Sequence, residues 1–239
     1  MRTLDSNSGR ANHGRRGSAS GLGLKRWEIQ PPAPPAFLER FSYLQPLVAQ
    51  ILYSRDIVAP EEIEAFLEGA FGPDNPFLLK GVDQAVALIR EEVRQGHHIV
   101  VYGDYDVDGV TASAILVLTL RALGAQVEAY IPNREDEGYG LNQEAIASLA
   151  EQGFGLLITV DCGIRSPDEV RLAQSLGMRV IITDHHHLGE ELPPAEAIIN
   201  PRQPDCPYPF KDLAGAGVAY KLAQALLRVN ARVPLSPAT

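Results

Sequence analysis

The sequence predicts an α/β fold in which a parallel sheet is covered by helices on both faces, with a short helical leader before it. Short apolar runs of strand length alternate with longer segments of helical apolar spacing from about residue 98 onward. The connections between them are short, as in βαβ units whose strands are buried on both sides. A chain of 239 residues is also long enough to bury a core around such a sheet.

The composition is ordinary for a soluble globular protein, with 45% hydrophobic and 21% charged residues. No apolar stretch has the length of a membrane span, and no signal-peptide pattern opens the chain, so no membrane association is expected. The two cysteines, Cys162 and Cys206, are too few for a disulfide framework. A cytoplasmic location is the default expectation.

The charge is divided unevenly along the chain. Residues 1–26 carry +5 and almost no apolar side chains, which predicts a disordered basic tail. The remainder carries −14, which is atypical of an independent nucleic-acid-binding protein, although a local basic groove is compatible with it. We expect a helical leader over residues 27–95 and the main domain over residues 96–239.

In the leader, apolar residues recur at helical spacing in three segments. They predict amphipathic helices over residues 37–52 and 60–67, and a further helix over residues 82–94.

The main domain then alternates strands and helices. Its expected strands are residues 99–102, 127–131, 156–160, 178–183 and 197–199. Its expected helices are residues 110–123, 142–152, one that begins with the capping box Ser166-Pro-Asp-Glu169, and 215–228.

An acidic turn follows the first of these strands, with Asp104, Asp106 and Asp108 on alternate residues. Like charges a few Å apart repel strongly, and a divalent cation would neutralise them. Oxygen ligands of this hardness suit Mg²⁺ or Mn²⁺. A calcium loop of the EF-hand type is the alternative. It does not fit, because position twelve is Ile115 instead of glutamate and the run before the loop is typical of a strand.

Two further strands also end in potential ligands. Asp161 follows the third strand, and Asp184, His185, His186 and His187 follow the fourth. Because parallel strands place their carboxyl ends at one edge of the sheet, these groups are expected to converge there. Carboxylates with an imidazole suit a two-metal site, and the imidazole favours Mn²⁺ over Mg²⁺.

Together these motifs resemble the DHH phosphoesterase superfamily and, within it, the bacterial exonucleases that act on single-stranded DNA. The resemblance rests on Gly-Asp-Tyr-Asp-Val-Asp-Gly (103–109), Asp-Cys-Gly (161–163) and Asp-His-His (184–186), in this order. Flanking stretches agree, among them Tyr-Ile-Pro-Asn-Arg (130–134) and Leu-Ala-Gly-Ala-Gly-Val (213–218), and the similarity covers about residues 27–230.

The resemblance implies a role for each matched residue. The metal ligands would be Asp104, Asp106, Asp108, Asp161 and His185, with Asp161 bridging two Mn²⁺ or Mg²⁺ ions and taking part in catalysis. His186 would act at the scissile phosphate, and Asp184 would orient a histidine. Arg134 would contact a phosphate.

The implied function is metal-dependent 5′-to-3′ exonucleolytic hydrolysis of single-stranded DNA in repair and recombination, with DNA-repair proteins as possible partners. Two alternatives stay open: a phosphodiesterase of short oligonucleotides or cyclic dinucleotides, and a non-catalytic interaction module. Family members carry a further metal-binding aspartate, a DHHA1 substrate-binding domain and an OB nucleic-acid-binding domain downstream. None is found before Thr239, so we expect residues 1–239 alone to bind metal weakly and degrade DNA poorly.

Overall fold

The computed structural model describes residues 30–69, 75–133, 138, 140–232 and 235. The expected basic tail and Arg134 therefore lie outside the described residues. The chain forms two compact units, Met1–Gly72 and Pro73–Thr239. The last helix that the sequence analysis assigns to the leader lies in the second unit, so the units divide before it.

The first unit contains three short helices, α1 (Pro35–Arg40), α2 (Pro46–Tyr53) and α3 (Pro60–Glu68). The single helix expected over residues 37–52 is therefore wrong. Pro46 begins α2, and the preceding Gln45 has extended backbone angles, φ −62° and ψ 138°. The proline ring disfavours a helical conformation at the residue before it, so α2 does not extend back through Gln45 to α1, which ends at Arg40. A small core of Phe41, Leu52 and Ile63 holds this unit together.

The second unit is a five-stranded, all-parallel sheet with helices, which confirms the predicted fold class. Its strand order is β2-β1-β3-β4-β5. The strands are β1 (His98–Gly103), β2 (Gln126–Tyr130), β3 (Phe154–Val160), β4 (Arg179–Thr183) and β5 (Ala197–Ile199). The helices are η1 (Pro76–Leu78), α4 (Val82–Gln95), α5 (Val107–Ala122), α6 (Gln143–Glu151), α7 (Pro167–Ser175) and α8 (Gly215–Arg232).

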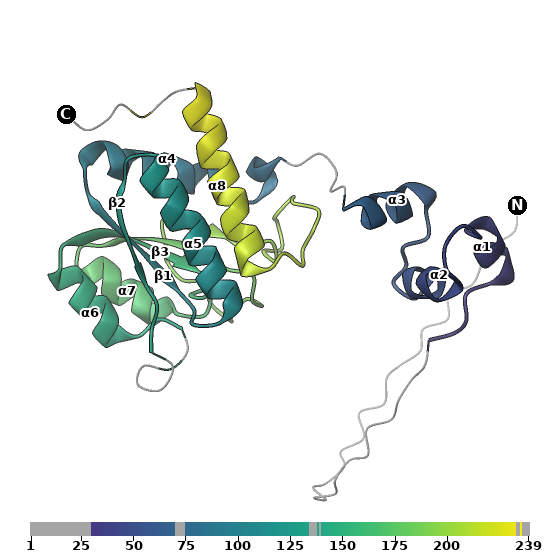
Figure 1. Cartoon of the computed structure of the whole chain (residues 1–239). Coiled ribbons are helices and arrows are strands. Elements are labelled where there is room, and N and C mark those ends of the chain that lie inside the picture. The colour runs from purple at the N-terminus through teal and green to yellow at the C-terminus, as the bar shows by residue number, and fades with distance from the viewer. Residues whose placement is uncertain (1–29, 70–74, 134–137, 139, 233–234, 236–239) are drawn as a thin grey trace, which may run out of the picture. The chain divides into compact units, whose positions relative to one another are not determined.

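Helices cover both faces of the sheet (Figure 1). On one face α4, α5 and α8 pack over alternate strand residues such as Ile99 and Val101. On the other face α6 and α7 pack over the residues between them, such as Val100 and Tyr102. Because both faces are buried, the central strands are continuous apolar runs, as the sequence analysis inferred.

The strand order places a topological switch point between β1 and β3. The chain leaves β1 for the edge strand β2 and then returns to the other side of β1 as β3. In open parallel sheets the loops diverge at such a point and leave a crevice at the carboxyl ends of the strands. The acidic turn after β1 and Asp161 after β3 flank this crevice.

Two helix starts differ from the sequence prediction. α5 begins at Val107, three residues before the expected start, because the Asp106 carboxylate caps it: Oδ1 accepts hydrogen bonds from the backbone N–H of Asp108 (2.8 Å) and Gly109 (3.0 Å). The capping box predicted at Ser166 is wrong. Its side chain makes no capping hydrogen bond, and its ψ of 55° departs from the extended backbone usual at a cap.

Among the helices in the described part of the chain, none is both long and apolar enough to cross a membrane.

Helix α5 offers a direct test of the packing. Leu120 is fully buried in the core that α5 shares with the sheet and α8, whereas Leu118 is 65% exposed on the same helix. We expect Leu120→Ala to lower the free energy of unfolding by about 2–5 kcal/mol, since it leaves a cavity in the core. Leu118→Ala should lower it by less than about 0.5 kcal/mol. Urea unfolding of both variants measures the difference, and equal losses would contradict the packing described.

Candidate metal centre

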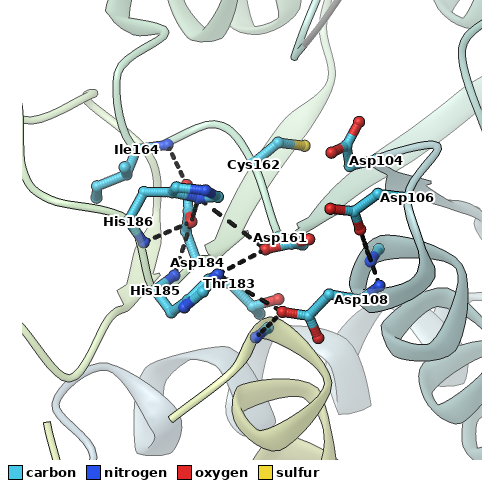
Figure 2. A network of polar contacts seen from close by, with 12 residues as sticks. Asp104, Asp106, Asp108, Asp161, Cys162, Ile164, Thr183, Asp184, His185 and His186 are labelled. Atoms are coloured by element: carbon cyan, nitrogen blue, oxygen red, sulfur yellow. Dashed lines mark hydrogen bonds and ion pairs between the residues drawn. The ribbon is translucent and has the colours of Figure 1, made fainter. Parts of the chain in front are cut away.

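Three loops bring acidic and histidine side chains together at the carboxyl edge of the sheet (Figure 2). The turn between β1 and α5 supplies Asp104 and Asp106, and the first turn of α5 supplies Asp108. The loop after β3 supplies Asp161, and the loop after β4 supplies the segment 184–186. Residues that lie up to 82 positions apart in the sequence thus share one site, as the strand-end argument predicts.

The side chains form two groups that could each hold a metal ion. Asp104, Asp106 and Asp161 make one group, and Asp161, His185 and His186 make the other. Within each group the potential ligand atoms lie within 4.8 Å of one another. Asp161 belongs to both groups, which is the position that a carboxylate bridging two ions would take.

Asp161 is the most constrained residue of the site. It is 2% exposed, and its φ of 61° lies in the left-handed region that few non-glycine residues adopt. Its Oδ1 is buried without a hydrogen-bond partner, even though His185 Nε2 lies 3.0 Å away. Burial, followed by the negative charges of Asp108 and Asp106, raises the pKa of Asp161 to about 7.

Asp108 links the acidic turn to the start of α8. Its two carboxylate oxygens accept hydrogen bonds of 2.7 Å each from the backbone N–H groups of Gly215 and Ala216. A Cβ atom at position 215 would lie 2.7 Å from Asp161 Oδ1, so only glycine allows α8 to start this close to the site. His185 Nε2 lies 3.6 Å from Asp108 Oδ2.

A second close approach holds the acidic turn itself. A Cβ atom at position 109 would come within 2.5–2.7 Å of the backbone of Asp104. Gly109 therefore lets the first turn of α5 pack directly against the residue that follows β1. This contact keeps Asp104 and Asp106 at the sheet edge.

Asp184 is buried and fully engaged in hydrogen bonds. Its Oδ1 accepts from the backbone N–H of His185 (2.7 Å) and His186 (3.0 Å) and lies 2.7 Å from His186 Nδ1, while Oδ2 accepts from Ile164 N–H (3.0 Å). Burial opposes ionisation, yet these hydrogen bonds hold the pKa of Asp184 below its ordinary value. The same side-chain hydrogen bond raises the pKa of His186.

Cys162, which follows Asp161, has a packing role. It is 1% exposed, and its Sγ lies 3.8 Å from the Tyr102 carbonyl oxygen. Burial raises the pKa of this thiol well above its ordinary value, so it is neutral and unsuited to bind a metal as thiolate.

The donor set fits Mn²⁺ or Mg²⁺. Carboxylate oxygens predominate, with imidazole nitrogen at one end of the site. The buried Asp161 Oδ1 accepts no hydrogen bond, and a bound cation would provide it with a partner. A cation would also relieve the repulsion that raises the pKa of Asp161.

Sequence reasoning missed the part that α8 plays. The glycines at positions 215 and 217 are visible in the sequence, but without a third glycine they do not make a dinucleotide-binding loop. Their small size at a helix start was the available signal for a close backbone approach.

Comparison with known proteins places these features in a family. The model of the DHH family, N-terminal domain, matches residues 98–238. The single-stranded-DNA-specific exonuclease RecJ of Bacillus subtilis (strain 168) is 47% identical over 205 residues, which cover 84% of this chain and 26% of that protein. RecJ of Escherichia coli (strain K12) is 43% identical over 184 residues, covering 77% of this chain and 31% of that protein.

Solved structures agree. RecJ in complex with Mn²⁺ from Thermus thermophilus superposes with a TM-score of 0.66 at 35% identity, covering 89% of this chain and 30% of that one. An exonuclease RecJ bound to manganese superposes with a TM-score of 0.61 at 43% identity, covering 69% of this chain and 41% of that one. The chain spans between about a quarter and a third of the length of the Bacillus subtilis and Escherichia coli relatives. On its sequence, its fold and this family match over residues 98–238, the chain belongs to the DHH family.

Proposed function

We propose that this chain carries the metal-dependent phosphodiester-hydrolysing site of a 5′-to-3′ exonuclease specific for single-stranded DNA. The observation that carries the proposal is the position of Asp161, a buried carboxylate shared by both groups of potential metal ligands. Relatives named as single-stranded-DNA-specific exonucleases, at 43–47% identity, support the choice of substrate.

In this proposal the sheet edge would hold two ions. Asp104, Asp106 and Asp161 would hold one, and Asp161 and His185 would hold the other together with the nearby carboxylate of Asp108. When bound, such ions lower the pKa of a coordinated water and neutralise charge on a phosphodiester. Asp108 keeps its hydrogen bonds to α8, since each carboxylate oxygen has more than one lone pair.

His186 acts on the scissile phosphate as a proton donor. Asp184 accepts a hydrogen bond from Nδ1–H of His186, which fixes the ring and favours its charged form. The Nε2–H group is then left to donate its proton to the leaving oxygen. As water attacks phosphorus, the bond to that oxygen breaks, and the proton from His186 completes the alcohol product.

Four further expectations belong to this proposal. Arg134, outside the described residues, is a candidate phosphate contact. A role in DNA repair with protein partners and a cytoplasmic location remain predictions. So does weak metal binding by residues 1–239 as a polypeptide.

A digestion assay with Mn²⁺ tests the activity. We expect slow release of mononucleotides from the 5′ end of single-stranded DNA, followed with 5′-labelled and 3′-labelled strands, and no digestion of duplex DNA. Hydrolysis of a dinucleotide alone would favour the short-oligonucleotide phosphodiesterase instead. Failure to hydrolyse any substrate would contradict the proposal for residues 1–239.

The role of His186 has a matched control in its neighbour, since the side chain of His187 is exposed. We expect His186→Ala to lower kcat by about 10²–10⁴-fold, the usual contribution of a general acid, with Mn²⁺ affinity unchanged. His187→Ala should leave both values unchanged. Loss of Mn²⁺ affinity in His186→Ala would show that His186 is a metal ligand and not the proton donor.

The shared carboxylate predicts a pH-dependent stability in metal-free protein. An acid whose pKa is raised on folding, here to about 7, stabilises the fold below pH 4 and loses that contribution as the pH rises through 7. At pH 8 in EDTA, Asp161→Asn should therefore have a free energy of unfolding higher than that of the parent chain by a few kcal/mol, because one pKa unit corresponds to about 1.4 kcal/mol. Urea unfolding measures this difference. Asparagine also tolerates the left-handed backbone.

Asp168→Asn serves as the control, because the Asp168 side chain is 78% exposed and its ion pair with Arg171 contributes little. Adding Mn²⁺ should stabilise the parent chain and the Asp168 variant and leave Asp161→Asn unaffected. If Mn²⁺ stabilised Asp161→Asn as much as the parent chain, Asp161 would not be a metal ligand.

A further inference from the structure

A cavity of about 370 Å³ lies beside His186, next to the carboxylate edge. Its lining comes from the loop between β3 and α7, the end of β4 and the segment before α6: Gly140, Gly163, Ile164, Arg165, Ser166, Asp184 and His186. Figure 2 shows Ile164 and His186 on the opposite side of Asp161 from Asp104 and Asp106. The cavity thus extends the proposed site away from the acidic turn.

The acidic group in this lining is a carboxylate whose charge is already stabilised by its neighbours. Asp184 is 1% exposed and accepts hydrogen bonds from three backbone N–H groups as well as the contact with His186. Because Asp184 is paired with His186, Arg165 supplies the remaining charge of the lining. A cavity with this lining favours an anion.

Arg165 is held in place without being neutralised. Its Nε donates a 2.8 Å hydrogen bond to the carbonyl oxygen of His187, which fixes the guanidinium against the loop that follows β4. Among the described residues no carboxylate pairs with Arg165, whereas Arg171, Arg179 and Arg202 each form an ion pair. The terminal nitrogens of Arg165 are thus available to a ligand, and a guanidinium matches a phosphate group with two parallel hydrogen bonds.

Ser166 supplies a further polar group. Its side chain makes no capping hydrogen bond to α7, although it precedes that helix. A hydroxyl in the cavity wall can donate to a phosphate oxygen or accept from a sugar hydroxyl. The volume lies at the lower end of the 300–1,000 Å³ typical of small-molecule sites, which suits one nucleotide.

We propose that this cavity is a subsite for a single nucleotide of the substrate and that Arg165 binds its phosphate group. The inference rests on the proposed function and adds a specificity residue to it. Arg165 contacts a phosphate other than the scissile one, so it contributes to binding and takes no part in proton transfer.

The test measures the affinity for thymidine 5′-monophosphate and for thymidine by calorimetric titration in EDTA, so that no metal contributes. The parent chain should bind the nucleotide and discriminate against the nucleoside. Arg165→Met should weaken nucleotide binding about tenfold or more, and Arg165→Lys should restore part of it. The affinity for thymidine should be the same in the parent chain and the Arg165 variants, because thymidine has no phosphate group for Arg165 to contact.

Arg171→Met is the matched control, since Arg171 is a nearby arginine on α7 that pairs with Asp168 and Glu191 and does not line the cavity. It should bind the nucleotide as the parent chain does. Equal affinities for the parent chain and Arg165→Met, equal losses in Arg171→Met, or no nucleotide binding by the parent chain would each overturn the subsite.

The digestion assay separates this inference from the proposed function. Cleavage of single-stranded DNA by the parent chain without nucleotide binding in the cavity would overturn the subsite and leave the exonuclease intact. Nucleotide binding that depends on Arg165, without cleavage of any substrate, would support the subsite and overturn the exonuclease.

Discussion

The repulsion among carboxylates at the end of β1 and β3 is the constraint on which the site depends. Asp161 is buried beside Asp106 and Asp108, with one oxygen that no hydrogen bond satisfies. An arrangement of this kind costs stability in the absence of a counterion. A cation shared by these groups would remove the cost, so the fold is organised around charge that a bound cation would neutralise.

The surrounding structure holds this unfavourable arrangement in place by close backbone approaches. Gly109 lets α5 pack against Asp104, and Gly215 lets the start of α8 reach Asp161. The α8 backbone then binds both oxygens of Asp108. On the histidine side, the hydrogen bonds of Asp184 stabilise its charged form and orient His186, which is a different role from that of the candidate metal ligands.

Much of this was predictable from local sequence pattern. Alternating apolar segments predicted the parallel sheet, and strand-end acids predicted which residues would meet, because parallel topology gathers carboxyl ends at one edge. Local signals were missed where two rules competed: Pro46 divides a helix whose apolar spacing continues through it, and Asp106 starts α5 earlier than the apolar run suggests. The bonds from α8 to Asp108 join residues 107 and 108 positions apart, so no local pattern predicts them.

Anomalous diffraction from crystals soaked in Mn²⁺ would test the central claim most directly. The account predicts two manganese peaks, both within coordination distance of the Asp161 carboxylate, one beside Asp104 and Asp106 and the other beside His185. Manganese bound at this edge without contact to Asp161, or bound only elsewhere on the chain, would contradict it.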